Sequence, residues 1–244
     1  MTNYQILNTE SHKDLTVRTD YSNSFGDRVS NVTTFPTEFG NVQNEYPILF
    51  RKHPETGEFG AFVMLGFDSG ENLFLSEKGW DADYIPAAIA RGPFLIGFQN
   101  QESQGKSAQE PVINIDMDSP RVTSDGGERV FDDEGNKTPY FDNIQRILAG
   151  IHKGVEYTKL MFSEFSELNL IEPVTIDVEF INGEKVKIDS CYTIHEERLK
   201  ELNGESLEKL NKSGLLQAAY IIIASLNNLK RLINKKNRLI TQQV

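Results

Sequence analysis

Four side chains that could line one pocket lie within a short segment, 79–94, which also holds the single tryptophan of the chain. Aromatic walls beside an acid and a base suit a ligand that has both apolar and charged parts. The candidate ligand-binding residues are therefore Trp80, Asp83, Tyr84 and Arg91. A structural interpretation is also open. In it, Asp81 caps a helix over 82–91, Trp80 packs against the first turn, and the acid and base form a salt bridge.

A second candidate surface lies in the C-terminal segment, where apolar residues recur with helical spacing from about 214 to 238. The last turns of this predicted helix carry cations and no acid, and the candidate partner-binding residues are Lys230, Arg231, Lys235 and Lys236. Such a surface would suit an acidic partner or an anionic lipid. Cations near the C-terminus of a helix also interact favourably with its dipole, so a structural role stays open.

Metal and catalytic signatures in the sequence are weak. His53-Pro-Glu55 has the His-x-Glu spacing of a facial-triad iron site, with His152 or His195 as the distal ligand. These residues lie in a predicted turn rather than on a rigid strand, so we expect no metal there. The acidic loop 116–138 does not match an EF-hand, and we expect it to be exposed. The sequence contains no nucleophile elbow, Walker A loop or Gly-x-Gly-x-x-Gly motif, and it predicts no cofactor.

The charge of the chain limits its partners. A formal net charge of −11 argues against nucleic acid, because phosphate backbones repel an acidic surface. The charge is uneven: residues 196–244 carry nine Lys and Arg against five Asp and Glu, a balance of +4, and the preceding part carries −15. This asymmetry could join a basic C-terminal face either to the acidic body of the chain or to an acidic partner.

Three features favour a cytoplasmic protein without a membrane span. The single cysteine, Cys191, cannot form an intrachain disulfide, which is typical of a reducing compartment, and it is expected to be buried. The first residues show no secretory signal. The longest apolar run, 215–226, is too short to span a bilayer and predicts a buried helix. The sequence leaves a homo-oligomer open.

The elements that must position these residues can be read from periodicity and turn signals. Two strands, 46–52 and 61–67, flank a turn and predict an antiparallel hairpin, and a second hairpin is predicted over 174–188 around Asn182-Gly183. Further strands are expected at 72–75, 94–98 and 112–116, the last two separated by a polar loop. Helices are expected at 82–91, at about 141–165 just after Pro139, and at 196–202, 206–212 and 214–238.

The predicted fold class is α+β, with an antiparallel β-rich N-terminal part, a β-hairpin and a helical C-terminal part. Residues 1–34 are polar and are expected to form a flexible N-terminal arm with one short strand around 15–18. Residues 35–240 are expected to form a single domain, with the hairpin 174–188 added to the N-terminal sheet.

Several of these segments, in this order, resemble the SapC family of bacterial proteins. The residues that carry the resemblance are Phe35-Pro-Thr-Glu-Phe39, Glu45-Tyr-Pro-Ile48, Gly70-Glu-Asn-Leu-Phe74, Gly79-Trp-Asp-Ala-Asp-Tyr-Ile-Pro86, Arg91-Gly-Pro-Phe94, Asp116-Met-Asp-Ser119, Leu170-Ile-Glu-Pro173, Gly214-Leu, Tyr220 and Ala224-Ser-Leu-Asn-Asn228. They cover about 35–235 of the chain.

The resemblance implies a link to bacterial surface-layer formation and serum resistance, and to genes for halogenase-like, cupin-like and TonB-dependent receptor proteins. It supplies no catalytic residues. A peptide-import permease that shares the family name needs several apolar spans, which this sequence lacks. We therefore expect a non-catalytic cytoplasmic accessory protein with a protein or peptide partner, halogenase-like and cupin-like proteins among the candidates. Two alternatives stay open: an enzyme or oxygenase-like protein with a pocket around Trp80, and a surface-layer component.

Overall fold

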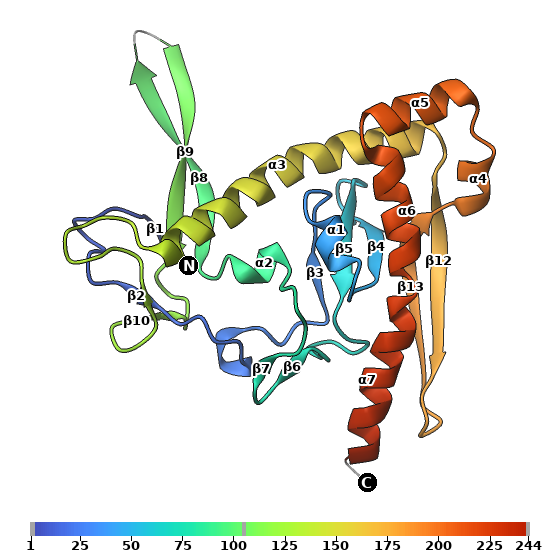
Figure 1. Cartoon of the computed structure of the whole chain (residues 1–244), viewed down its shortest axis with the longest axis horizontal. Helices are drawn as coiled ribbons and strands as arrows, with labels where there is room; N and C mark the ends of the chain where they lie inside the picture. Colours follow the sequence, from blue (N-terminus) through green and yellow to red (C-terminus); the bar gives the residue numbers. More distant parts are fainter. Residues whose placement is uncertain (1–2, 104–105, 243–244) are drawn as a thin grey trace. The chain divides into compact units, whose positions relative to one another are not determined.

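The computed structural model describes residues 3–103 and 106–242. The chain is divided into two compact units (Figure 1). Unit 1 comprises Met1–Asp27 and Ala87–His152, and unit 2 comprises Arg28–Pro86 and Lys153–Val244. The sheets are antiparallel, the strands lie mostly in the N-terminal half and the helices mostly in the C-terminal part, so the predicted α+β class is confirmed.

Unit 1 is built on a long antiparallel hairpin, to which one N-terminal strand adds. The three strands are β1 (Tyr4–Ile6), β8 (Phe94–Ser103) and β9 (Lys106–Asp116). A smaller sheet joins β2 (Thr16–Val17), β10 (Val122–Thr123) and β11 (Glu128–Arg129). The core of the unit includes Val17, Phe94, Ile115 and Phe141, so β2 takes part in it.

Unit 2 is built on a five-stranded sheet with the order β12-β13-β4-β5-β3. Its strands are β3 (Asn31–Thr33), β4 (Ile48–Lys52), β5 (Phe59–Met64), β12 (Ile171–Glu179) and β13 (Lys185–Ile194). Both predicted hairpins are confirmed, as β4–β5 and β12–β13. Tyr192 of β13 lies opposite Phe50 of β4, so the second hairpin adds to the same sheet, as predicted. Another pair of short strands is β6 (Leu75–Ser76) and β7 (Gly79–Trp80).

The long predicted helix is present as α3 (Pro139–Glu167), whose first part belongs to unit 1 and whose second part belongs to unit 2. Thr138 caps it, since its Oγ1 accepts from the backbone N–H of Phe141 at 3.3 Å. The remaining helices of unit 2 are α1 (Phe39–Val42), α4 (Glu196–Lys200), α5 (Gly204–Lys212), α6 (Leu215–Ser225) and α7 (Asn228–Gln242).

The helix predicted over 214–238 is interrupted between α6 and α7, and the reason is tertiary. The Oγ of Ser225 accepts from the backbone N–H of Ile48 on β4 at 2.9 Å and donates to the carbonyl of Ile222 at 2.6 Å. Asn228 donates through its side chain to the carbonyl of Gln43 at 2.8 Å. These bonds fix the chain to β4 and α1 at the point where the apolar periodicity alone predicts an unbroken helix.

The helix predicted over 82–91 is wrong, because only α2 (Ala87–Ala90) is helical there. The residue before a proline is disfavoured in the α region, which affects Ile85 before Pro86. The backbone N–H groups of Asp83 and Tyr84 donate to the carboxylate of Glu45, at 2.6 and 3.2 Å. The predicted polar loop after residue 98 is also wrong, because β8 and β9 continue the ladder through it.

Residues 3–34 contribute β1, β2, β3 and the short helix η1 (Asn23–Phe25). The short strand expected around 15–18 is confirmed by β2. The division into a flexible arm over 1–34 and a single domain over 35–240 stays a prediction. None of the helices in the described part of the chain combines the length and apolarity needed to cross a bilayer.

Candidate functional site

The motif segments of unit 2 meet in a buried network of hydrogen bonds around α1. Glu38, just before α1, is 5% exposed and accepts from the hydroxyls of Thr34 and Tyr84, each at 2.8 Å. Glu45, just after α1, is 6% exposed and accepts from the backbone at 83 and 84 and from Arg231 of α7 at 3.0 Å. One short helix thus places two carboxylates against the 79–86 segment.

Tyr46 connects the same segment to the core of unit 2. Its hydroxyl donates to the carbonyl of Tyr84 at 2.6 Å and accepts from the indole N–H of Trp80 at 2.8 Å. Burial raises the pKa of both tyrosines, and the neighbouring Glu38 charge raises the pKa of Tyr84 further. The hydroxyls therefore stay protonated at neutral pH and act as hydrogen-bond donors that hold the segment.

The structure brings together three of the four predicted ligand-binding residues in unit 2, namely Trp80, Asp83 and Tyr84. The indole N–H and the Tyr84 hydroxyl are both used inside the network, and the Asp83 side chain is exposed. Arg91 belongs to unit 1, where its guanidinium donates to the carbonyl of Phe94 at 2.7 Å. Desolvation lowers the pKa of Arg91. A ligand role for these residues stays a prediction.

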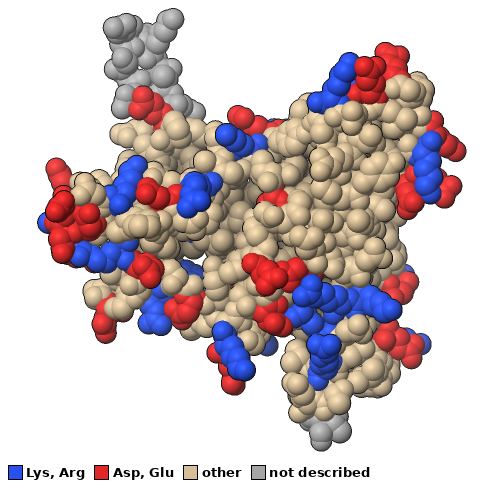
Figure 2. All heavy atoms as spheres, viewed as in Figure 1, with Lys and Arg blue, Asp and Glu red and all other residues tan. Residues whose placement is uncertain are grey.

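Three of the four predicted partner-binding cations make ion pairs within unit 2. Arg231 pairs with Glu45, Lys235 pairs with Asp81 at 2.5 Å, and Lys236 pairs with Asp68 and Glu71 at 2.7 and 2.6 Å. Figure 2 shows this group of basic side chains over α7 beside acidic ones. Lys230 is exposed and has no ion pair among the described residues. Asp81 thus pairs with α7 rather than capping the helix expected after it.

The residues considered for metal binding or nucleophilic chemistry have local structural roles. The Nδ1 of His53 accepts from the backbone N–H groups of Glu55 and Thr56, each at 3.3 Å, and so holds the β4–β5 turn. Cys191 is buried as expected, and burial raises its pKa. Within the described residues, no group of three His, Cys, Asp or Glu side chains could hold a metal ion.

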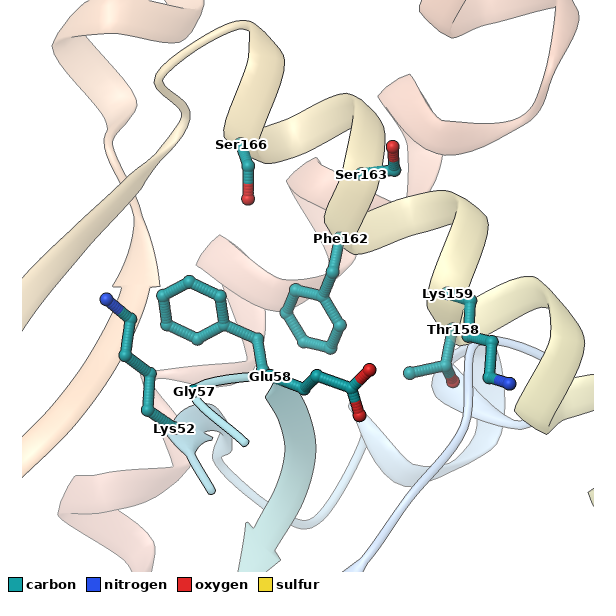
Figure 3. A pocket seen from close by; sticks show the side chains of 9 residues that line it. Lys52, Gly57, Glu58, Thr158, Lys159, Phe162, Ser163 and Ser166 are labelled. Atoms are coloured by element: carbon teal, nitrogen blue, oxygen red, sulfur yellow. The ribbon is translucent and has the colours of Figure 1, made fainter. Parts of the chain in front are cut away.

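A cavity of about 440 Å³ in unit 2 lies between the β4–β5 hairpin and the second part of α3 (Figure 3). It is lined by Lys52, Gly57, Glu58, Phe59, Thr158, Lys159, Phe162, Ser163 and Ser166. Phe59 and Phe162 stack with ring centroids 5.6 Å apart, and Phe162 also meets Phe50 edge-on at 4.9 Å. The floor of the cavity is therefore aromatic and is supported by the sheet.

The rim of this cavity is charged and polar. Lys52 and Lys159 lie on opposite sides of Phe162 in Figure 3, and the carboxylate of Glu58 points toward Thr158. Among the described residues, none of these three charged side chains makes an ion pair. Lys52 instead lies over the rings of Phe59 and Tyr192, at 4.9 and 5.6 Å. The cavity can thus receive an apolar group on its floor and charged groups at its rim.

No sequence motif indicates this cavity, because its walls are far apart in the chain, on 52–59 and 158–166. One signal was available: Thr158, Phe162 and Ser166 recur every four residues, which marks a stripe on α3 where the apolar periodicity is broken by hydroxyl groups. A broken stripe on an otherwise regular helix can indicate a face that is not fully packed.

Comparisons with known proteins agree with the motif resemblance. Comparison with curated proteins and with solved structures found no match. A family model described as SapC matches residues 7–232, which is most of the 244-residue chain. The match includes both carboxylates of the α1 network, the 79–86 segment and both walls of the cavity. The chain therefore belongs to the SapC family.

Proposed function

We propose that this protein is a non-catalytic binding or accessory protein that takes a protein or peptide partner. It would act in the cytoplasm of a Gram-negative-type bacterium, in a system for surface-protein or peptide modification and uptake. The surface-protein setting, and halogenase-like or cupin-like proteins as partners, come from the family resemblance alone. For this chain, the proposal is supported by the difference between the α1 network and the cavity, both in unit 2.

The proposal depends mainly on one contrast: polar groups in the α1 network bond to the same chain, whereas the charged groups at the cavity make no ion pair among the described residues. In the α1 network, Glu38, Glu45 and Tyr46 accept from or donate to other groups of the same chain. At the cavity, Lys52, Glu58 and Lys159 surround an aromatic floor without an ion pair among the described residues. The nine lining residues include neither histidine nor cysteine, so they do not supply a histidine-paired nucleophile. This arrangement supports binding rather than chemistry.

The test is capture of the partner by the tagged full-length chain, followed by reconstitution with that partner in purified form. We expect a specific partner that binds the purified chain at a defined stoichiometry in calorimetry. Failure to recover any specific partner, together with turnover of a small substrate by the purified chain, would contradict the proposal. Turnover would instead support the enzyme alternative.

A further inference from the structure

We infer that the cavity between β4–β5 and α3 binds an extended peptide segment in which a large apolar side chain, aromatic or aliphatic, stands next to a carboxylate. The inference rests on the proposed function and names the chemistry of the partner segment. Three properties of the cavity support it: its aromatic floor, the charges at its rim and the exposure of its lining residues.

The floor selects an apolar side chain. Phe59 and Phe162 present stacked rings, and both belong to an aromatic cluster with Phe50 and Tyr192 in the sheet. Phe162 is 7% exposed, so its position is fixed by packing and it does not need to be ordered by a ligand. Phe59 is half-buried and stacks on this fixed ring, so it offers its exposed ring surface to an incoming aromatic or aliphatic group at low entropic cost.

The rim selects an acidic neighbour for that side chain. Two lysines and one glutamate give the rim a local charge of +1 in a chain whose net charge is −11. The two ammonium groups come from different elements, β4 and α3, and lie on opposite sides of Phe162 (Figure 3). A segment that crosses the floor would place a carboxylate near either lysine. The Glu58 carboxylate could accept hydrogen bonds from peptide N–H groups. The hydroxyls of Thr158 and Ser166 could accept from N–H groups or donate to carbonyls.

The exposure of the lining favours a peptide over a small molecule. Six of the nine lining residues are exposed, including Lys52, Glu58 and Lys159. Sites for small molecules bury most of the ligand surface, whereas an open groove contacts one face of a longer chain. Thr158, Phe162 and Ser166 also share one face of α3 in a row inclined to the helix axis, which gives an extended segment a continuous wall.

The test uses the full-length chain and octapeptides with blocked ends and a fluorescent label, measured by anisotropy. The central residues are Asp-Phe-Asp in a Gly-Ser background, and the matched peptides carry Lys-Phe-Lys or Asp-Ala-Asp. We expect Asp-Phe-Asp to bind at least about tenfold tighter than either matched peptide. Unlabelled phenylalanine is the competitor that represents a small ligand, and we expect it to displace nothing.

The protein variants are surface charge reversals, so folding is easily preserved and is checked by thermal melting. Lys52→Glu and Lys159→Glu should each weaken binding of the Asp-Phe-Asp peptide at least about fivefold. The matched control is Lys153→Glu, another exposed lysine on the same helix that does not line the cavity, and the affinity of this variant should stay within about twofold of the unchanged chain.

The inference would be overturned by no binding of Asp-Phe-Asp up to ~1 mM, by equal binding of the three peptides, or by displacement by free phenylalanine. An equal loss in Lys153→Glu would show a general charge effect and would also overturn it. The proposed function is contradicted by a different result. A natural partner that binds the Lys52→Glu and Lys159→Glu variants unchanged contradicts the cavity site alone, whereas turnover without any partner contradicts the function.

Discussion

The hydroxyl of Tyr84 illustrates how a residue that looks like a ligand contact can serve the fold. It donates to Glu38, a carboxylate that is 5% exposed, while the backbone of Tyr84 is held by Glu45 and Tyr46. A buried carboxylate needs hydrogen-bond donors, because without them nothing offsets the free energy lost when its charge is removed from water. Within the motif at 79–86, the Tyr84 hydroxyl thus meets a demand of the fold.

Tyr84→Phe should therefore lower the free energy of unfolding by about 1–3 kcal/mol, since Glu38 loses a donor that a phenyl ring cannot replace. Chemical denaturation of the full chain measures the change. Tyr220→Phe is the matched control, because Tyr220 is 53% exposed, and its effect should stay within about 0.5 kcal/mol. Equal effects at both positions would contradict the structural role of the network.

Arg121 provides the corresponding anchor in unit 1. Its Nη2 donates to both carboxylate oxygens of Asp27, at 2.7 and 2.6 Å, and its Nη1 donates to the carbonyls of Arg18 and Asp20. Arg121 is 5% exposed, and its guanidinium also lies over the rings of Tyr21 and Phe25. One side chain thus ties residues 18–27 to the rest of unit 1.

Arg121→Lys keeps the charge and loses the planar fork, so it should lower the free energy of unfolding by about 2 kcal/mol or more. Arg18→Lys is the control, because the Arg18 side chain is 44% exposed and its pair with Asp20 is at the surface. Thermal melting compares the two variants. If Arg121→Lys melted like Arg18→Lys, the buried ion pair would not anchor this segment.

At the scale of elements, local periodicities and turn signals predict the helices and strands that depend on them, and they fail where contacts between distant residues decide the structure. Both hairpins and α3 carry their own turn, alternation or capping signals, and both hairpins and α3 are confirmed. The helix expected over 82–91 failed because Glu45, far away in the sequence, takes the backbone N–H groups there. The break between α6 and α7 depends on β4 in the same way.

The candidate site follows the same division. Its chemistry-bearing residues at 79–84 were visible as a motif, but their hydrogen-bond partners at 38, 45 and 46 decide whether they are free for a ligand. The two walls of the cavity, on 52–59 and 158–166, are far apart in the sequence, so no single motif contains both of them. Single-sequence patterns report neighbours along an element and not across elements.

Two glycines of α3 allow a matched test of packing between α3 and the loop before α1. A Cβ at Gly154 would lie 2.6 Å from the Cβ of Phe35 and 2.8 Å from the Oγ1 of Thr37, whereas a Cβ at Gly150 would meet open space. Gly154→Ala should lower the free energy of unfolding by about 1–3 kcal/mol, because the loop must move. Gly150→Ala should raise it by about 0.5–1 kcal/mol through helix propensity. Urea denaturation measures both, and stabilisation by Gly154→Ala would contradict the close approach.

At the scale of the whole molecule, the basic residues near the C-terminus form ion pairs with acidic residues elsewhere in the chain. The basic helix α7 pairs with four acidic residues of unit 2, at 45, 68, 71 and 81. Lys235 and Lys236 also lie over the rings of Phe74 and Phe180, at 4.7 and 5.7 Å. The basic C-terminal face is thus joined to the acidic body, and a role of Lys230 and its neighbours toward a partner stays a prediction.

The pair of Lys235 and Asp81 should contribute to stability in a pH-dependent way. The hydrogen bond from Lys235 lowers the pKa of Asp81 below its ordinary value of 3.8. A depressed carboxyl pKa stabilises the fold above the unfolded value, and this contribution is lost as the pH falls through the folded value. A double-mutant cycle of Asp81→Asn with Lys235→Met should give a coupling of up to about 1 kcal/mol at pH 6, because Asp81 is largely exposed. A coupling that persists below pH ~2 would contradict the assignment.

The central claim is that unit 2 binds its partner segment at the cavity between β4–β5 and α3. Hydrogen exchange of the full chain, with and without saturating Asp-Phe-Asp octapeptide, tests it directly. We predict slower amide exchange over 52–59 and 158–166, the two walls of the cavity, with little change elsewhere. Protection over 79–91 or 230–236 with unchanged exchange at the two walls would contradict the claim.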